Sequence, residues 1–234
     1  MSYARRNDGR KFDETRKMEA KLGVIPRADG SAMFKTGDTI AIAAVYGPRE
    51  LHPKFLQDPE KGILRCNYDM ISFSVPDRKR PGPARRSTEI SLVTEKALVP
   101  ILDLKQFPNA VVDVFIQIVQ ANAGTRCAGI CAASMALAHA GVPMKDLISA
   151  VSVGKVGDKI VIDLDKHEED FPEGATDIPV AMRSNGEVTL LQLDGEVSKD
   201  ELFSALEMAK KGCNEIDELQ RKTLRNFYQG VKNE

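Results

Sequence analysis

A short segment, Asn122-Ala123-Gly124-Thr125-Arg126, has the composition of an anion-binding site. Apolar side chains alternate with others over residues 112–119, which predicts a strand, and the Ala-rich residues 128–137 predict a closely packed helix. We expect Thr125 to be the N-cap of that helix. A helix start presents unpaired N–H groups and partial positive charge, so Gly124, Thr125 and Arg126 predict a site for phosphate or a similar anion.

The basic segment 78–86 is a second candidate, because it holds five Lys or Arg residues and no acidic residue. Its Pro and Gly residues prevent a helix before about Ser87, where Ser87 or Thr88 could act as the cap. Residues 78–80 fit a solvated basic loop as well as a binding loop. Arg85 and Arg86 directly precede the predicted helix, and two guanidinium groups in that position can clamp phosphates in bidentate fashion.

Acidic residues crowd the segment from Asp163 to Asp170 and recur at Glu173 and Asp177. The segment lies between two predicted strands, so some of these carboxylates must converge at one end of a sheet. Crowded carboxylates repel one another unless a cation or proton joins them, which makes a Mg²⁺ or Mn²⁺ site possible. The alternative is an acidic surface loop, which the residues alone favour, and we expect His167 to be exposed.

Composition limits the class of protein. The chain has 234 residues, 42% of them hydrophobic, and a formal net charge of -1. This length suits one large or two small globular domains, and a near-neutral nucleic-acid enzyme must concentrate its basic residues around one channel. The first residues hold no apolar core of a signal peptide, and the apolar stretch 128–142 is shorter than the ~20 residues of a membrane span. We therefore expect a cytoplasmic protein that does not enter a membrane.

The four cysteines form no CxxC pair and have no nearby histidine cluster. Cys127 and Cys131 are four residues apart on the predicted helix, which could place two thiolates on one face of a metal site. Their Ala and Met neighbours favour packing in the core instead.

Hydrophobic periodicity predicts two successive units of strands followed by a helix. In the first, the expected strands are 22–25, 31–35, 39–46, 64–73 and the one at 112–119, with helices over 87–102 and after residue 125. In the second, the expected strands are 147–153, 159–164, 178–182 and 188–193, followed by a long amphipathic helix from Ser198. The fold class is α+β with helices on the sheet faces, divided into domains 1–145 and 146–234.

Four segments in this order, 84–90, 122–126, 165–177 and 178–182, resemble the RNase PH family of phosphorolytic exoribonucleases. Segments 46–53 and 140–148 extend the likeness, which runs from about residue 10 to about residue 225. Within the family, the chain is most similar to the catalytic branch found in archaeal exosome cores. The resemblance implies an RNase PH-like fold and an enzyme that uses inorganic phosphate to shorten RNA from its 3′ end, releasing nucleoside diphosphates, and that can run in reverse to add tails.

The resemblance also implies roles for individual residues. Arg86 would bind the attacking phosphate together with Gly124, Thr125 and Arg126, and Arg85 would hold the RNA backbone. More loosely, Arg65 lies in a region that touches RNA in relatives.

Asp170 and Asp177 match the family's two acidic positions and would carry Mg²⁺ or Mn²⁺, with Asp177 the stronger candidate for metal ligand or general acid. They are seven residues apart where six are expected, so Glu169 is an alternative to Asp170.

The family further implies a six-membered ring, a trimer of heterodimers with a related non-catalytic subunit, capped by RNA-binding subunits. One alternative is a non-catalytic, RNA-binding ring subunit, which the presence of Arg86, Arg126 and Asp177 disfavours. Another is a small-molecule phosphotransferase, which would need a glycine-rich loop with a Lys that this chain lacks.

Overall fold

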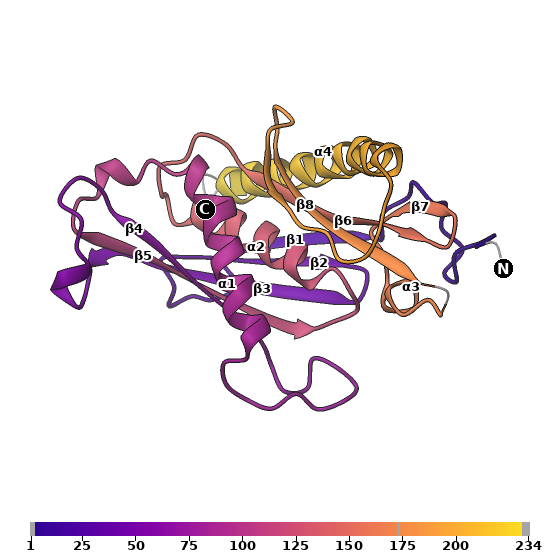
Figure 1. The fold of residues 1–234 in the computed structure, drawn as a ribbon. Helices are drawn as coiled ribbons and strands as arrows, with labels where there is room; N and C mark the ends of the chain where they lie inside the picture. The colour runs from indigo at the N-terminus through magenta and orange to yellow at the C-terminus, as the bar shows by residue number, and fades with distance from the viewer. Residues whose placement is uncertain (1–2, 173, 231–234) are drawn as a thin grey trace.

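Two β-sheets form the framework of the protein in the computed structural model, which describes residues 3–172 and 174–230 (Figure 1). The first sheet has the order β1-β2-β3-β5-β4, with β1 Met18–Leu22, β2 Gly30–Thr36, β3 Thr39–Glu50, β5 Ala110–Gln120 and β4 Ile63–Met70. Its strands are antiparallel except for the parallel pair β4–β5. The second sheet is antiparallel, in the order β7-β6-β8-β9, with β7 Lys159–Ile162, β6 Ile148–Val156, β8 Ala175–Arg183 and β9 Val188–Leu191.

Helix α2, Thr125–His139, lies between the two sheets and contacts β2, β3 and β5 of the first and β6 and β8 of the second. Its residues from Cys127 to Leu137 are buried, and most of them are small. Small side chains let both sheets approach the helix axis: a Cβ added at Gly129 would lie 3.1 Å from the Ile116 side chain. The predicted Ala-rich helix is therefore confirmed as the centre of the core.

The other helices cover the outside of this framework. Helix α1, Arg85–Leu98, packs on β4, and the long α4, Lys199–Gly230, lies along the second sheet (Figure 1). Helix α3, Lys166–Glu169, is a single turn between β7 and β8, and 3-10 turns lie at Lys54–Leu56, Val99–Ile101 and Leu104–Gln106. The predicted α+β class and the long C-terminal helix are confirmed.

All four cysteines are buried and unpaired. Burial raises the pKa of the Cys131 thiol to about 12, so this group stays protonated at neutral pH. The structure confirms the prediction that Cys127 and Cys131 are core residues.

Several element boundaries differ from the prediction. A strand at 22–25 is wrong: β1 ends at Leu22, because Gly23 has a left-handed φ of 69°. The helix expected to reach Leu102 ends at Leu98, and a 3-10 turn containing Pro100 follows. The acidic segment contains α3, whose Asp165 and Glu168 form a reciprocal capping box that the sequence analysis missed.

Both predicted helix caps are also wrong. Gly124, with φ 62°, is the N-cap of α2, and Thr125 is its first residue. Ala84 is the N-cap of α1, which makes Arg85 and Arg86 part of the helix itself, while the buried Ser87 hydroxyl donates to Asp69. Neither N-cap residue makes a side-chain cap hydrogen bond.

The hydrophobic core is continuous across the two sheets, and a smaller cluster joins the N-terminal arm, residues 3–16, to the second sheet. In that cluster Tyr3 packs with Val156, Val161 and Leu164. The division into domains at residue 145 stays a prediction. Among the described residues, no helix is long and apolar enough to cross a membrane.

Candidate active site

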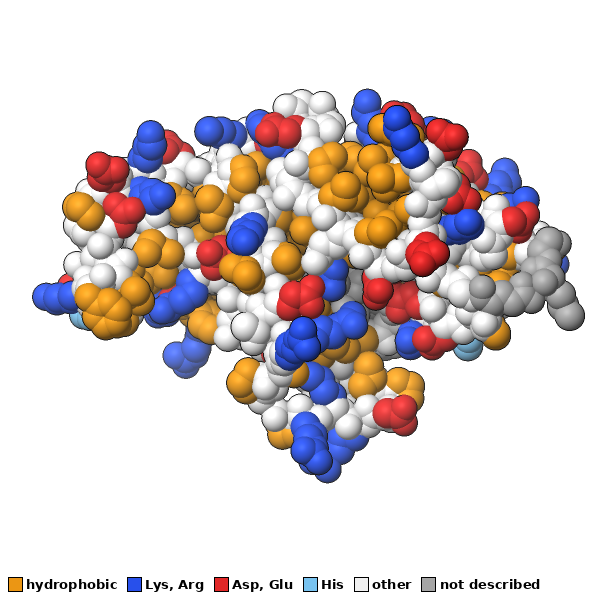
Figure 2. Space-filling view, viewed as in Figure 1, with side chains coloured by type: hydrophobic (Ala, Val, Ile, Leu, Met, Phe, Trp, Pro, Cys, Tyr) orange, Lys and Arg blue, Asp and Glu red, His pale blue; other side chains and the backbone are white. Residues whose placement is uncertain are grey.

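A cavity of about 480 Å³ lies where the first turns of α1 and α2 meet the second sheet. Its walls carry both charges, with arginines on the helix side and carboxylates on the side of α3 and β8. The lining residues are Arg86, Glu89, Arg126, Leu164, Lys166, Glu169, Asp170, Ala175, Asp177, Pro179, Gln192, Leu193, Asp194 and Gly195. Figure 2 shows Lys and Arg side chains gathered around the start of α1 and the loop before it, with acidic side chains directly beside them.

Arg86 and Arg126 have the same position in their helices, since each is the second residue, of α1 and of α2 respectively. Neither helix has an acidic residue in its first turn. An arginine there opposes the positive end of the helix dipole, an arrangement that costs roughly 0.3–1 kcal/mol per charge. Because this unfavourable arrangement occurs in two helices at the same cavity, we infer that a bound anion compensates the positive charge there.

The guanidinium of Arg126 is held by two residues that the sequence analysis missed. Its Nη1 donates to Gln192 Oε1 at the end of β9, and its Nη2 lies 3.7 Å from Glu89 Oε1 on α1. Gln192 Nε2 donates to the same Glu89 oxygen over 3.2 Å. The Arg126 Nε is buried and has no hydrogen-bond partner among the described residues.

Asp177 lies in β8 on the opposite wall of the cavity. The Ser152 hydroxyl of β6 donates a hydrogen bond to Asp177 Oδ1. In the antiparallel pairing of β6 with β8, Gly154 lies opposite Asp177. Burial raises the pKa of the Asp177 carboxyl, while the Ser152 hydroxyl, Arg126 and Arg86 oppose that rise. Arg126 and Arg86 are therefore close enough to Asp177 to act on its charge.

Glu169 and Asp170 end α3 beside Asp177 but differ in exposure. The Glu169 side chain is 26% exposed, and burial and the charge of Asp177 raise its pKa, against Lys166, Arg86 and the Gly124 backbone. The Asp170 side chain is 62% exposed and accepts a 2.7 Å hydrogen bond from Lys166. Both carboxylates line the cavity, so the structure brings the predicted Asp170 and its alternative to the same wall.

Gly124 directly precedes α2 and does not itself line the cavity; it lies beside a separate small cavity with Thr36 and Asp163. Ala123 and Gly124 both have left-handed backbones, with φ 59° and 62°, and only the Gly adopts this without strain. Thr125 is buried and does not line the cavity, because its hydroxyl accepts a 2.9 Å hydrogen bond from Tyr68. Thr125 therefore contributes its backbone and fixes the helix start.

Two predicted RNA-binding residues lie outside the cavity. Arg85 is exposed on the first turn of α1 and does not line the cavity. Arg65 of β4 pairs with the buried Asp113 of β5 through its Nε at 2.5 Å, and Arg49 of β3 shares the same carboxylate. Arg65 and Arg49 thus form a separate basic group on the first sheet, each about half exposed at the side chain.

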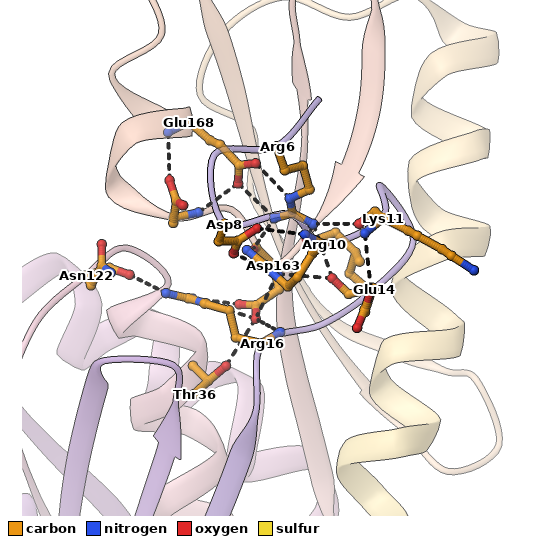
Figure 3. A network of polar contacts seen from close by, with 12 residues as sticks. Arg6, Asp8, Arg10, Lys11, Glu14, Arg16, Thr36, Asn122, Asp163 and Glu168 are labelled. Atoms are coloured by element: carbon orange, nitrogen blue, oxygen red, sulfur yellow. Dashed lines mark hydrogen bonds and ion pairs between the residues drawn. The ribbon is translucent and has the colours of Figure 1, made fainter. Parts of the chain in front are cut away.

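The acidic segment does not act as one unit. Asp163 and Glu168 point away from the cavity into a buried network with Arg16 and Arg6 (Figure 3). His167 is exposed, as expected. Among residues 3–172 and 174–230 there is no cluster of three or more His, Cys, Asp or Glu side chains arranged to hold a metal ion. Asp177 with Asp170 or Glu169 offers two carboxylates, a set that suits Mg²⁺ shared with substrate phosphates.

Comparison with known proteins decides the family. Residues 14–143 match the 3′ exoribonuclease family, domain 1, of RNase PH, and residues 146–212 match domain 2 of the same family. The chain belongs to the RNase PH family. The first match includes Arg86 and Arg126 and the second includes Asp177, so both matched segments contribute residues to the cavity.

Relatives of this RNase PH chain include the exosome complex component Rrp41 of Thermococcus gammatolerans, 50% identical over 98% of this chain and 92% of the relative. The exosome complex component Rrp41 of Methanopyrus kandleri is 47% identical over 96% of this chain and 94% of its own. Rice Rrp46 has a similar structure, with a TM-score of 0.82, 26% identity and coverage of 94% and 100% of the two chains. The Archaeoglobus fulgidus exosome with RNA bound to the active site shares the fold, with a TM-score of 0.81 and 24% identity over 92% of each chain.

Proposed function

We propose that this chain is the catalytic RNase PH-like subunit of an archaeal exosome core and that it degrades RNA from the 3′ end by phosphorolysis. Two findings support the assignment: membership of the RNase PH family, and 47–50% sequence identity to Rrp41 components over nearly the full length of the chain. The observation that carries it is the meeting of Arg86 and Arg126, each in the first turn of a helix, with Asp177 in one cavity. A cytoplasmic location stays a prediction.

The arrangement suits phosphoryl transfer, which depends on positioning and charge stabilisation and needs no nucleophilic side chain. Arg86 and Arg126, with the backbone at Gly124, would bind inorganic phosphate. An oxygen of that phosphate attacks the last phosphodiester phosphorus, the bond from phosphorus to the 3′ oxygen breaks, and a nucleoside diphosphate leaves. The shortened RNA keeps the 3′ oxygen, which takes up a proton, and the reverse reaction lengthens the RNA.

A divalent cation, Mg²⁺ or Mn²⁺, would be held by Asp177 and Asp170 on the opposite wall. The surface pair between Asp170 and Lys166 is exposed, and such pairs contribute only ~0–1 kcal/mol, so a cation can replace the lysine at little cost. When bound, the cation would neutralise charge on the phosphate oxygens. Arg85 would hold the RNA backbone outside the cavity, and Arg65 would contact RNA further along its path.

The proposed assembly is a ring of alternating subunits, a trimer of heterodimers with a related non-catalytic RNase PH-like chain, capped by RNA-binding subunits. Similarity to an exosome component and to Rrp46 supports partners of this kind. A near-neutral chain that grips a polyanion also favours a channel to which several subunits contribute basic residues.

The test uses the chain assembled with its RNase PH-like partner and an end-labelled oligoadenylate. We expect shortening from the 3′ end that requires both phosphate and a divalent cation and yields nucleoside diphosphate. Nucleoside monophosphate formed without phosphate would instead make the enzyme a hydrolase, and RNA binding without shortening would make the chain a non-catalytic ring subunit.

Single substitutions test the site itself. Asp177→Asn is expected to lower turnover by roughly 100-fold or more, because the carboxylate wall loses its most buried charge, while RNA binding stays near wild type. Asp158→Asn is the matched control, since Asp158 is half exposed in the turn between β6 and β7 and does not line the cavity. Equal turnover of both variants would contradict the assignment.

A further inference from the structure

We propose that Arg16, through its pairing with Asp163, is a positioning residue that fixes the phosphate-binding turn at residues 122–124 relative to the carboxylate wall. The inference rests on the proposed function and assigns a role to a residue outside the cavity. Arg16 precedes β1 in the chain, and Asp163 directly follows β7, so the pair joins segments 147 residues apart.

Arg16 grips Asp163 with both its backbone and its side chain. The Arg16 N–H donates to Asp163 Oδ2 at 2.8 Å, Nε donates to the same oxygen at 3.0 Å, and Nη2 donates to Oδ1 at 2.7 Å. Both side chains are 6% exposed, and Thr36 of β2 adds a 3.1 Å hydrogen bond to the carboxylate. Arg16 and Asp163 thus form a buried bidentate ion pair, and such a pair fixes the orientation of the guanidinium relative to the carboxylate.

The remaining nitrogen of the guanidinium reaches the turn. Arg16 Nη1 donates to the carbonyl of Asn122 at 2.5 Å, and a Cβ added at Gly124 would lie 3.2 Å from Nη2 (Figure 3). Thr39 holds the other side of the same turn, accepting from the Asn122 N–H at 2.9 Å and donating to the Ala123 carbonyl at 2.7 Å. Since Ala123 is left-handed without being Gly, this turn needs such external contacts to persist.

The same pair is connected to the carboxylate wall on its other side. Asp163 donates its N–H to the Ser152 carbonyl at 2.6 Å, and the Ser152 hydroxyl donates to Asp177. Asn122 Oδ1 accepts a 3.1 Å hydrogen bond from the N–H of Lys166, the first residue of α3. Hydrogen bonds therefore connect Arg16 and Asp163 both to the turn before Arg126 and to the wall that carries Asp177.

A purely structural role is the competing explanation, and the network itself supplies a matched control. Arg6 pairs with Glu168 at 2.7 Å, and these side chains are 0% and 1% exposed. The other Arg6 hydrogen bonds go to carbonyls of residues 11, 14, 162 and 163, so Arg6 does not contact the turn at 122–124. Arg6 thus offers an equally buried arginine in the same network without the link to the turn.

The experiment compares Arg16→Lys with Arg6→Lys in the assembled complex. Lysine keeps the charge but cannot span a carboxylate and a carbonyl with a planar fork. We expect Arg16→Lys to raise the KM for phosphate by about 10- to 100-fold with the KM for RNA within about twofold of wild type, and Arg6→Lys to leave both constants within about twofold. Melting temperatures of both variants are measured alongside.

Three outcomes would overturn the inference. They are a wild-type phosphate KM in Arg16→Lys, an equal rise in Arg6→Lys, or a parallel rise in the KM for RNA. If Arg16→Lys fails to assemble, Asp163→Asn replaces it, because Asn tolerates the left-handed φ of 52° at this position and keeps the side-chain shape. The same rise in phosphate KM is expected there.

A second readout separates this inference from the proposed function. Inorganic phosphate should raise the melting temperature of wild type and of Arg6→Lys alike, and should do so much less for Arg16→Lys. One outcome is that phosphate stabilises the complex in an Arg16-dependent way but the complex does not shorten RNA. That outcome would contradict the proposed reaction and support the positioning role of Arg16. Active wild type with equal phosphate stabilisation in all three proteins would remove only the positioning role.

Discussion

Glu168 and Asp170 are two residues apart in the chain and lie in opposite environments. Glu168 is 1% exposed, accepts hydrogen bonds from Tyr3 and Arg6 and caps α3, whereas the Asp170 side chain is 62% exposed at the cavity. One turn of helix is enough to separate them, because α3 has one face on the N-terminal arm and the other toward Asp177. Neighbouring carboxylates in this segment are therefore divided between a buried ion pair and the wall of the cavity.

Substitution of these two carboxylates should separate stability from activity. Glu168→Gln leaves Arg6 as a buried charge with a weakened partner, so we expect it to lower the free energy of unfolding by roughly 3–5 kcal/mol. Asp170→Asn removes an exposed charge and should change the free energy of unfolding by about 0.5 kcal/mol or less, while raising the metal concentration needed for half-maximal turnover. Denaturant unfolding and metal titration measure both effects, and equal stability of the two variants would contradict this division.

At the scale of the element, the first turn of α1 presents two arginines to different surroundings. Arg86 lines the cavity with Arg126, and Arg85 is exposed outside it. The helix begins at Arg85, before the predicted cap at Ser87 or Thr88, so both arginines belong to its first turn. In the proposed function, this helix start supports Arg86 for phosphate and Arg85 for the RNA backbone.

Conservative replacement of each arginine should therefore affect different substrates. Arg86→Gln is expected to raise the KM for phosphate by roughly 10-fold or more, since a hydrogen bond to a charged group contributes about 1.5–3 kcal/mol. Arg85→Gln should weaken RNA binding and reduce its dependence on log salt concentration by about one unit, with little change for phosphate. Steady-state kinetics and RNA binding at several salt concentrations test the pair, and exchanged phenotypes would show that the assignment is reversed.

The N-terminal arm depends on ionised carboxylates for its attachment to the second sheet. Burial opposes ionisation of Asp163, but the hydrogen bonds and charge of Arg16 dominate and hold the pKa of that carboxyl below its usual value of 3.8. The unfolded chain then binds more protons than the folded one at acid pH, so this contribution is complete above the unfolded pKa and is lost as pH falls through the folded pKa.

We expect the contribution of Asp163 to the free energy of unfolding to be complete above about pH 5 and to be lost below about pH 4. Asp163→Asn should be less stable at neutral pH and show a shallower fall in acid. Burial opposes ionisation of the Asp113 carboxyl, but Arg65 and Arg49 lower its pKa as well. Asp113 should therefore preserve part of the fall in the free energy of unfolding at acid pH in this variant. Urea unfolding at pH 7, 5, 4 and 3 measures the effect, and an unchanged slope in the variant would contradict it.

At the scale of the whole molecule, the cavity lies between the first turns of α1 and α2 and the second sheet. Helix α2 contacts both sheets, and its second residue lines the cavity, so the turn proposed to bind phosphate is rigidly connected to the core. The separate basic group of Arg49 and Arg65 lies on the first sheet, away from the cavity residues. An RNA strand that contacts both the cavity and the Arg49 and Arg65 group must run along the protein surface between them.

Assembly should therefore control RNA retention. Mixed with its RNase PH-like partner, the chain is expected to elute from size exclusion as a closed ring of about six subunits and to degrade RNA only in that fraction. The same chain alone should bind a long oligoadenylate more weakly than the ring, because fewer basic residues reach the RNA. Full phosphorolysis by the isolated monomer would contradict this expectation.

The sequence by itself determined the parts of the site that are local. Arg86 and Arg126 stand out through their charge beside a predicted helix start, and Asp177 through the resemblance of its segment; the structure places these three side chains in one cavity, whereas Arg85 and Thr125 do not line it. Strand and helix periodicity likewise placed the two sheets, α2 and α4, with errors at element ends, where capping depends on single contacts.

Only the tertiary structure decided which charges face each other. In the structure some carboxylates of the acidic segment are buried in ion pairs and others line the cavity. Gln192 and Glu89 contact Arg126, and Arg16 pairs with Asp163. Those partners are separated by 66 residues for Arg126 with Gln192 and by 147 for Arg16 with Asp163. Local hydrophobic periodicity fixes which face of an element is buried but carries no information about which distant polar group meets it there, because that pairing depends on how the two sheets pack against α2.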